Sequence, residues 1–235
     1  MASAQKVMLV TGGTSGIGAE TARQAAAAGY RLAISGRDQE KLIKQVAELG
    51  GEEEALGVVA DVAEWDEVSD MVKATKDKFG RIDVVFANAG SGAKRGFLEE
   101  SPEKWRSMIL TNVYGVALTI RATLPILLEQ GSGHFVLTSS VAGRRNAPGS
   151  LYAATKWAVG SIGEGLRQEL RHTHENNSIR VTLIEPGMVD TPFFDNRPEN
   201  ALESADIARA VLYAVEQPEH VDVNEIMIRP SAQAN

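Results

Sequence analysis

The sequence predicts an α/β fold in a single domain, residues 1–235, built on a mainly parallel, seven-stranded sheet with helices on both faces. Two features of the chain lead to this prediction. Short runs of Val, Ile, Leu and Ala alternate along the sequence with longer stretches of helical composition. Several of those runs are almost continuously apolar, as expected of strands that helices cover on both faces. Together they indicate a Rossmann-type, doubly wound sheet.

The expected elements can be followed in order along the chain. The runs expected to form strands are Lys6–Thr11, Arg31–Gly36, Ala55–Asp61, Ile82–Ala87, Gly133–Ser140, Arg180–Glu185 and Glu225–Arg229. The stretches expected to form helices are Gly16–Ala28, Gln39–Leu49, Glu64–Phe79, Pro102–Gln130, Leu151–His174 and Ala205–Glu216. Pro186–Asn200 is rich in Gly, Pro and Asn and is expected to be irregular, and long segments of that kind are usually functional or mobile.

Composition excludes several classes of function. Hydrophobic residues make up 43% of the chain and can fill a core, whereas a net charge of −7 and a pI near 5.2 argue against nucleic-acid and anionic-membrane partners. The absence of cysteine excludes disulfides and thiolate chemistry. The four histidines follow no metal-binding spacing, so no metal site is expected. No signal peptide is visible and no stretch approaches a membrane span, so we expect a cytoplasmic protein.

The segment Thr11–Gly18 follows the first predicted strand and opens the first predicted helix, which is the context that a dinucleotide site requires. Gly12 allows a tight turn, Gly16 lets the backbone approach a pyrophosphate, and Gly18 lets helix and strand pack closely. The N-terminus of the helix offers unpaired N–H groups and a partial positive charge to phosphates. The turn therefore predicts dinucleotide binding.

Tyr152 and Lys156 are four residues apart in a predicted helix and so share one of its faces. A tyrosine ordinarily keeps its proton up to a pKa of about 10, and a cation within a few ångströms favours the phenolate. The pair therefore predicts an acid–base group that works near neutral pH.

With these motifs the chain resembles the short-chain dehydrogenase/reductase family, and the resemblance covers nearly the whole sequence. The motifs that carry it stand in the order Thr11–Gly18, Asp61-Val62, Asn88–Gly90, Asn112, Ser139-Ser140, Tyr152 with Lys156, and Pro186–Thr191. The resemblance implies an oxidoreductase that transfers a hydride between a nicotinamide cofactor and a carbonyl or alcohol.

The resemblance also implies which residues hold the cofactor. Asp61 and Val62 would border the adenine, and Thr191 would hold the nicotinamide carboxamide. The residues implied are Gly12, Thr14, Ser15, Gly16, Ile17, Gly18, Asp61, Val62, Asn88, Ala89, Gly90, Tyr152, Lys156, Pro186, Gly187, Val189 and Thr191.

Arg37 favours NADP(H) over NAD(H). The acid that would accept from both ribose hydroxyls of NAD would fall at Gly36 in the family's register, and it is absent. The planar guanidinium of Arg37 suits a 2′-phosphate, because it makes charge-assisted hydrogen bonds in a fixed fork. Asp38, one residue further on, is expected to begin the next helix, where a negative charge is favourable.

Four residues are implied to be catalytic: Asn112, Ser140, Tyr152 and Lys156. Tyr152 would give a proton to a carbonyl oxygen, or accept one from an alcohol in reverse. Lys156 would lower the pKa of Tyr152 and bind the ribose of the nicotinamide. Asn112 would anchor a water that relays protons to Lys156. Asn is a poor residue inside a helix, which marks it independently of the family.

The choice between two serines rests on alignment. The tail Ser-Ser-Val-Ala-Gly143 makes Ser140 the residue that holds the substrate oxygen, whereas the commonest spacing from Tyr152 points to Ser139. We favour Ser140, because the loop Gly143–Leu151 can be one residue shorter without changing the strand end. Neighbouring residues on a strand face opposite ways, so only one of the two can face the site.

The substrate is less well defined. The C-terminus resembles the bacterial NADP-dependent 3-hydroxy acid (serine-type) dehydrogenases and aldehyde reductases, and segment 187–204 would cover the substrate. Four cations on loops beside the predicted site could receive a carboxylate or could be ordinary solvated residues: Lys94, Arg95, Arg144 and Arg145.

Other assignments stay open. A 3-oxoacyl-type ketoreductase and an extended-type sugar-nucleotide enzyme would share the fold, and so would a non-catalytic NADP-sensing regulator, although such regulators commonly lose the Tyr or the Lys. The resemblance also implies a homodimer or homotetramer, formed through the helices Pro102–Gln130 and Leu151–His174.

Overall fold

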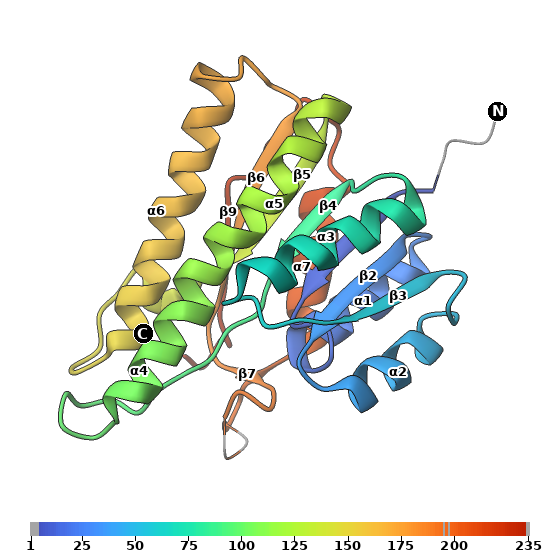
Figure 1. The fold of residues 1–235 in the computed structure, drawn as a ribbon. Helices are drawn as coiled ribbons and strands as arrows, with labels where there is room; N and C mark the ends of the chain where they lie inside the picture. Colours follow the sequence, from blue (N-terminus) through green and yellow to red (C-terminus); the bar gives the residue numbers. More distant parts are fainter. Residues whose placement is uncertain (1–4, 195, 197, 234–235) are drawn as a thin grey trace.

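A computed structural model describes residues 5–194, 196 and 198–233 of the chain. Its main sheet contains seven parallel strands in the order β3-β2-β1-β4-β5-β6-β9 (Figure 1). They are β1 Val7–Thr11, β2 Arg31–Gly36, β3 Ala55–Val59, β4 Val84–Ala87, β5 Gly133–Thr138, β6 Ile179–Pro186 and β9 Glu225–Ile228. The order reverses at β1, which pairs with both β2 and β4, and such a switch point opens a ligand crevice at the carboxyl ends of the strands.

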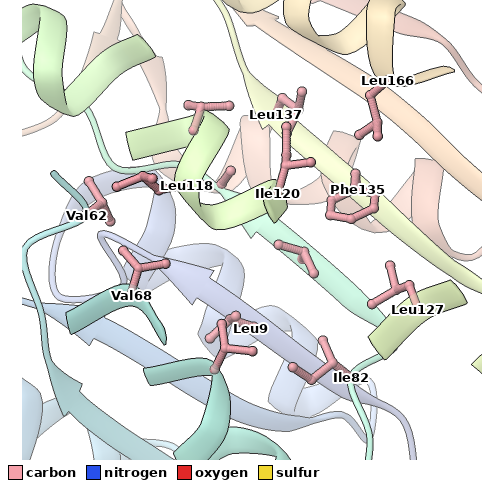
Figure 2. Close-up of a cluster of buried hydrophobic side chains, with 14 of the residues drawn as sticks. Leu9, Val62, Val68, Ile82, Leu118, Ile120, Leu127, Phe135, Leu137 and Leu166 are labelled. Carbon is pink, nitrogen blue, oxygen red and sulfur yellow. The ribbon is translucent and has the colours of Figure 1, made fainter. Parts of the chain in front are cut away.

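The helices form a layer on each side of the sheet. They are α1 Gly16–Ala27, α2 Gln39–Glu48, α3 Trp65–Phe79, α4 Pro102–Ile109, α5 Gly115–Gln130, α6 Leu151–His172 and α7 Ser204–Val215. Buried residues of α1, α2 and α7 pack in one apolar cluster, and those of α3, α5 and α6 in the other, part of which is drawn in Figure 2. The predicted doubly wound α/β class is confirmed.

Two strand ends differ from the sequence prediction for visible reasons. Ile82 was expected in a strand, but its backbone N–H and C=O bond the Gln130 side chain at 3.1 and 2.7 Å, so β4 begins at Val84. β5 ends at Thr138 rather than Ser140, and the Thr138 carbonyl accepts from Lys156 Nζ at 2.8 Å. Side chains, rather than the ladder, use the backbone at these two ends.

The predicted helix Pro102–Gln130 is interrupted by a π-helical turn over Leu110–Tyr114. Such single turns often occur at functional sites. By length and composition alone, the stretch Pro102–Gln130 could also cross a membrane, because an 18-residue window within it has a mean hydropathy of 1.3, so the expectation that no stretch approaches a span is wrong. In the fold, Val116, Ile120 and Leu127 of this helix are buried in the apolar cluster against the sheet.

The segment expected to be irregular, Pro186–Asn200, is partly ordered in strands. Pro186 ends β6, and β7 (Val189–Asp190) pairs in parallel with β8 (Leu202–Glu203). This two-stranded sheet lies at the carboxyl edge of the main sheet (Figure 1). The pairing of β7 with β8 brings the two ends of segment 187–204 together. Residues 195 and 197 of this segment lie outside the described residues.

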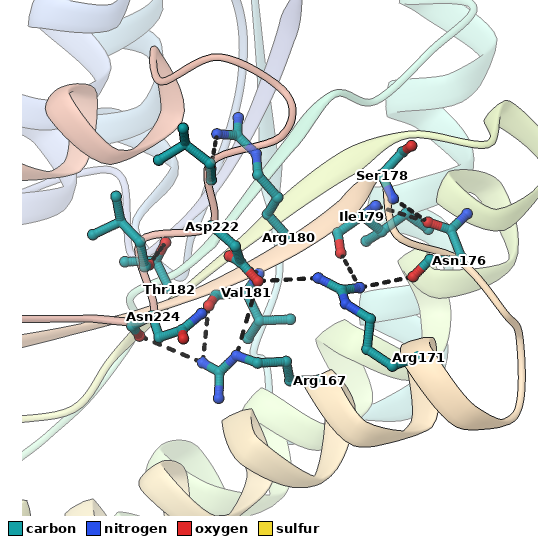
Figure 3. Close-up of polar contacts among 12 residues, drawn as sticks. Arg167, Arg171, Asn176, Ser178, Ile179, Arg180, Val181, Thr182, Asp222 and Asn224 are labelled. Atoms are coloured by element: carbon teal, nitrogen blue, oxygen red, sulfur yellow. Dashed lines mark hydrogen bonds and ion pairs between the residues drawn. The ribbon is translucent and has the colours of Figure 1, made fainter.

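A polar network joins α6, β6 and the loop before β9 (Figure 3). Asp222 accepts from Arg171 at 3.0 Å and from the Val181 backbone at 3.2 Å. Arg171 also donates to the Ile179 carbonyl at 3.0 Å. The network fixes the C-terminal end of α6 on β6, and so sets the position of the whole helix.

His134 lies inside β5 and is 1% exposed. Thr182 Oγ1 gives its proton to the Val223 carbonyl at 2.6 Å, so it can only accept from His134 Nε2, at 2.7 Å. Nδ1 is buried without a hydrogen-bond partner in the described part of the chain. Burial, followed by the nearby Arg180, lowers the pKa of His134 to about 3. This histidine is a neutral core residue.

His134 makes stability depend on pH. The unfolded chain takes up a proton on this ring near pH 6.5, whereas the folded protein resists it until about pH 3. Between these values the unfolded state holds more protons, so the free energy of unfolding falls as the pH is lowered. We expect His134→Gln to reduce that slope by up to about 1.4 kcal/mol per pH unit. Urea denaturation over this pH range measures it. The exposed His220→Gln is the control, and equal slopes in both variants would refute the assignment.

Candidate active site

The four predicted catalytic residues come from three elements that meet at the carboxyl edge of the sheet. Tyr152 and Lys156 lie on the first two turns of α6, Ser140 follows β5, and Asn112 lies in the π-helical turn before α5. Ser150 caps α6 by accepting from the Ala153 N–H at 3.2 Å. This cap fixes where the helix begins, and therefore which face carries Tyr152.

Tyr152 is half-buried, and its side chain forms a hydrogen bond with Ser140. Burial raises the pKa of Tyr152 to about 12, against a smaller lowering by the Ser140 hydrogen bond. The phenol is therefore protonated at neutral pH. A protonated phenol beside a serine hydroxyl can donate to an oxygen placed between them.

Lys156 is 4% exposed, and its ammonium donates to the Thr138 carbonyl at 2.8 Å. Burial lowers the pKa of Lys156 to about 8. Its Nζ lies 5.7 Å from the centre of the Tyr152 ring. In this structure the ammonium is directed at the Thr138 carbonyl and burial opposes the charged form of both groups, so the expected lowering of the Tyr152 pKa by Lys156 stays a prediction.

Ser139 and Ser140 face different parts of the molecule. Ser140 Oγ accepts from the Ala142 N–H at 3.1 Å, donates to the Pro186 carbonyl at 3.3 Å and bonds Tyr152. Ser139 Oγ instead donates to the Lys156 backbone carbonyl at 3.0 Å. Ser140 is therefore the serine beside the phenol, and Ser139 fastens the end of β5 to α6.

Asn112 is fully buried. Its Oδ1 accepts from the Ser91 N–H at 2.8 Å, and its Nδ2 donates to the Ser91 carbonyl at 2.9 Å and to Thr155 Oγ1 at 3.1 Å. Gly90 lies between Asn112 and Lys156, since a Cβ at Gly90 would come within 3.4 Å of Asn112 Oδ1 and 3.7 Å of Lys156 Nζ. Asn112 ties the loop after β4 to α6, and the predicted water relay stays a prediction.

The glycine turn has the geometry that close approach to a ligand requires. Gly12 and Gly16 have positive φ angles of 66° and 52°. A Cβ at Gly18 would lie 2.2 Å from the Gly12 carbonyl oxygen, so no side chain fits there. Ser15 begins α1 without a side-chain cap, and the first turn contains no acidic residue. The N–H groups of this helix end, at Ile17 and its neighbours, are thus left for an anion.

The residues expected to border the nucleotide fall into two groups. Asn88 works through the scaffold: its Nδ2 donates to the Thr11 carbonyl at 3.2 Å, and Thr138 Oγ1 donates to its Oδ1 at 3.3 Å. Val62 is 5% exposed and packs on Gly115, so its side chain belongs to the core. The backbone of the next residue, Ala89, is also fixed, because its N–H donates to Thr11 Oγ1 at 3.1 Å.

Arg37 extends from the end of β2 with its side chain 73% exposed, and its nearest ion-pair contact is Asp61 at 3.6 Å. A Cβ at Gly36 would lie 2.8 Å from Thr14 Cγ2, which explains why an acid is disfavoured at that position. Asp38 accepts from the Lys41 N–H at 3.1 Å and begins α2, as the sequence predicts. The tip of β2 thus carries a largely exposed guanidinium whose ion-pair contact, at 3.6 Å, is Asp61.

Segment 187–204 contacts the glycine turn at Thr191. The Thr191 side chain lies against Gly16, where a Cβ would be 3.1 Å from Thr191 Cγ2. Val189 is 3% exposed, and Gly187 packs so closely on Gln233 and Pro230 that a Cβ would clash. The base of this segment is thus fixed beside the predicted pyrophosphate site.

Of the four loop cations, Arg144 pairs with carboxylates of the protein itself. Its Nε bonds Glu185 Oε1 at 2.7 Å, and its NH2 forms an ion pair with Glu225. These two carboxylates neutralise the guanidinium, so Arg144 ties the turn after Ser140 to β6 and β9 and is not offered to a substrate. Lys94, Arg95 and Arg145 are exposed. The described residues contain no cluster of His, Cys, Asp and Glu that could hold a metal ion.

Phe193 was missed by the sequence analysis. Its ring packs on Tyr152 with ring centres 5.6 Å apart, and Phe194 packs on it edge-on at 5.2 Å. The available signal was two adjacent aromatic residues inside a stretch otherwise rich in Gly, Pro and Asn. Thr138 and Thr155, which hold Lys156 and Asn112, were also missed, because a threonine at a strand end or in a helix carries no distinctive pattern.

Known proteins share this fold and much of this sequence. Residues 6–202 match the family model described as short chain dehydrogenase. An uncharacterised oxidoreductase of Staphylococcus saprophyticus is 40% identical over 231 residues, which cover 96% of this chain and 97% of that protein. A Staphylococcus aureus relative, also described as an uncharacterised oxidoreductase, is 39% identical over 229 residues, covering 96% of this chain and 97% of that protein.

Solved structures agree with these matches. An alcohol dehydrogenase of the archaeon Thermococcus sibiricus, complexed with 5-hydroxy-NADP, has a TM-score of 0.87 and 32% identity, covering 98% of this chain and 99% of that one. Serine dehydrogenase of Escherichia coli has a TM-score of 0.86 and 31% identity, covering 97% and 100%. Sequence, fold and the arrangement of the site thus lead to one conclusion: this chain belongs to the short-chain dehydrogenase family of oxidoreductases.

Proposed function

We propose that this protein is a cytoplasmic, NADP(H)-dependent oxidoreductase that interconverts a carbonyl and an alcohol, with Tyr152 as the general acid–base. One observation carries the proposal: a protonated phenol, a serine hydroxyl and a buried ammonium gather beside an uncapped helix end at the switch point of a parallel sheet. The proposed substrates are secondary alcohols and their ketones, small aldehydes, and 3-hydroxy acids, the last suggested by the similarity to serine dehydrogenase.

The residues present fit a dinucleotide. The cradle at Gly12, Gly16 and Gly18 leaves no room for side chains, and the α1 N-terminus is free of acidic residues. Arg37 would bind a 2′-phosphate, and Thr191, beside Gly16, would bind the nicotinamide end. The bound cofactor would supply or accept the hydride. Neighbouring structures carry NADP or 5-hydroxy-NADP in three cases and NAD in another, so the preference for NADP(H) in this chain rests on Arg37.

The chain's own residues would manage the proton. In the reducing direction, the substrate oxygen would lie between Tyr152 and Ser140, and Tyr152 would donate its proton as charge develops on that oxygen. Ser140 would hold the oxygen, an interaction that strengthens in the transition state. The Lys156 ammonium, on the same helix face, would stabilise the phenolate left behind. Because the pKa of Lys156 is about 8, its ammonium could then return a proton to the phenolate.

We further propose that the protein forms a homodimer or homotetramer through the outer face of the long helices. Ile109, Tyr114 and Trp157 are between 41% and 47% exposed on α4, the π-helical turn and α6. Large apolar side chains gathered on neighbouring elements commonly mark an interface. These side chains support association without fixing the number of subunits.

The serine assignment can be tested with a matched pair. We expect Ser140→Ala to lower kcat for NADPH-dependent carbonyl reduction about 10²- to 10³-fold, because it removes the hydroxyl that holds the developing oxyanion. Ser139→Ala removes only the bond to the Lys156 carbonyl and should keep kcat within about threefold. Steady-state kinetics on a panel of aldehydes, ketones and 3-oxo acids measures both. An inactive Ser139→Ala beside an active Ser140→Ala would reverse the assignment.

The cofactor preference can be tested at Arg37. Arg37→Ala should raise the KM for NADPH about 10- to 100-fold, because charge-assisted hydrogen bonds to the 2′-phosphate are lost, and leave the KM for NADH unchanged. Lys41→Ala, which removes an exposed cation from the neighbouring helix, is the matched control. An unchanged KM for NADPH in Arg37→Ala would show that another residue, or none, selects the phosphate.

A further inference from the structure

Phe193 occupies a place that bears on the substrate. Its ring lies on the ring of Tyr152 with an interplanar angle of 57°, and Phe194 packs against its edge at 75°. On another side it meets Gly92, where a Cβ would come 2.9 Å from Phe193 Cζ and 3.2 Å from Cε1. Three separate segments thus hold the ring beside the phenol: α6, the loop after β4, and segment 187–204.

Gly92 is glycine for a reason of space. Its backbone has no positive φ, so the clash with Phe193 is the one constraint visible at this position. Even a methyl group there would have to push the Phe193 ring away. The position of Phe193 therefore depends on a loop outside the segment that carries it.

Phe193 also offers free apolar surface, because it is 42% exposed while packed on Tyr152. An oxygen placed between the Tyr152 and Ser140 hydroxyls belongs to a carbonyl carbon with one or two substituents. Because the Phe193 ring packs on the Tyr152 ring, a substituent on that side of the carbonyl carbon would lie against the Phe193 ring. Apolar and aromatic groups gain from that contact, both by leaving water and by ring–ring packing.

A carboxylate would not gain from the same contact. The face of an aromatic ring carries partial negative charge, and a desolvated anion needs a charged partner. Arg144, the cation just after Ser140 in the chain, is already neutralised by Glu185 and Glu225. The buried Lys156 ammonium is directed at the Thr138 carbonyl. The Phe193 ring itself therefore favours an uncharged substituent over a carboxylate.

We infer that Phe193 is a specificity-determining residue, and that the substrates of this site are carbonyls and alcohols with an apolar or aromatic substituent rather than free 3-oxo or 3-hydroxy acids. The inference rests on the proposed function, because it places the substrate oxygen at Tyr152. It narrows the substrate range given above by excluding the anionic members.

The test compares a free acid with its ethyl ester, and that ester with one that carries a phenyl group in place of a methyl group. The probes are 3-oxobutanoate, its ethyl ester, and ethyl 3-oxo-3-phenylpropanoate, each reduced with NADPH. The wild-type protein should show kcat/KM for the ethyl ester at least about tenfold above that for the free acid, and a further gain for the phenyl ester. Higher kcat/KM for the free acid would overturn the inference.

Two variants test the role of Phe193: one removes its ring, and the other displaces the ring from the loop that contains Gly92. Phe193→Ala should lower kcat/KM for the phenyl ester about tenfold or more, mainly through KM, and narrow the ester-to-acid ratio. Gly92→Ala should shift the ratio in the same direction by displacing the ring. Phe97→Ala, which removes an exposed aromatic ring packed on Trp105, is the control and should change neither. The KM for NADPH reports that the fold is intact, and an unchanged ester-to-acid ratio in Phe193→Ala would overturn the inference.

A binding measurement separates this inference from the proposed function. If no probe is reduced, the proposed function fails, and saturation-transfer NMR with NADP+ present then decides the inference. Binding of the phenyl ester that is lost in Phe193→Ala and retained in Phe97→Ala upholds the apolar site. Equal binding of the phenyl ester to both variants, or stronger binding of the free acid, overturns it.

Discussion

The site depends on one buried interaction, in which the Lys156 ammonium donates to the carbonyl of Thr138 at the last residue of β5. A charge that has lost its water needs a fixed partner, and here the partner is the end of a central strand. The bond therefore joins α6 to the sheet at the level of Tyr152. Ser139 makes a second join by donating to the Lys156 backbone carbonyl. The next residue, Ser140, lies beside the phenol and bonds it.

The same burial sets the electrostatics of the pair. It raises the pKa of Tyr152 to about 12 and lowers the pKa of Lys156 to about 8, so at neutral pH the phenol is neutral and the ammonium charged. Pairs of groups whose surroundings push their pKa values in opposite directions are a mark of acid–base sites.

Much of this architecture follows from local patterns in the sequence. Buried parallel strands are mostly apolar, so the runs Lys6–Thr11 and Arg180–Glu185 could be recognised as the strands that the structure has as β1 and β6. The glycine turn could be recognised because Gly18 packs too closely on Gly12 for any side chain. The remainder depends on distant contacts. The π-helical turn at Asn112 accompanies bonds to Ser91 and Thr155, and the partners of Arg144 come from two other strands. The raised pKa of Tyr152 follows from burial, which spacing along a helix does not reveal.

The central claim is that the Tyr152 hydroxyl transfers the proton, and Tyr152→Phe tests it most directly. Phenylalanine keeps the ring on which Phe193 packs and removes only the hydroxyl. NADPH binding, followed by fluorescence, should stay within about twofold, while the rate of carbonyl reduction should fall about 10²- to 10⁴-fold, the usual contribution of a positioned general acid. Carbonyl reduction by Tyr152→Phe within about threefold of the wild-type rate would contradict the account, because another group would then be supplying the proton.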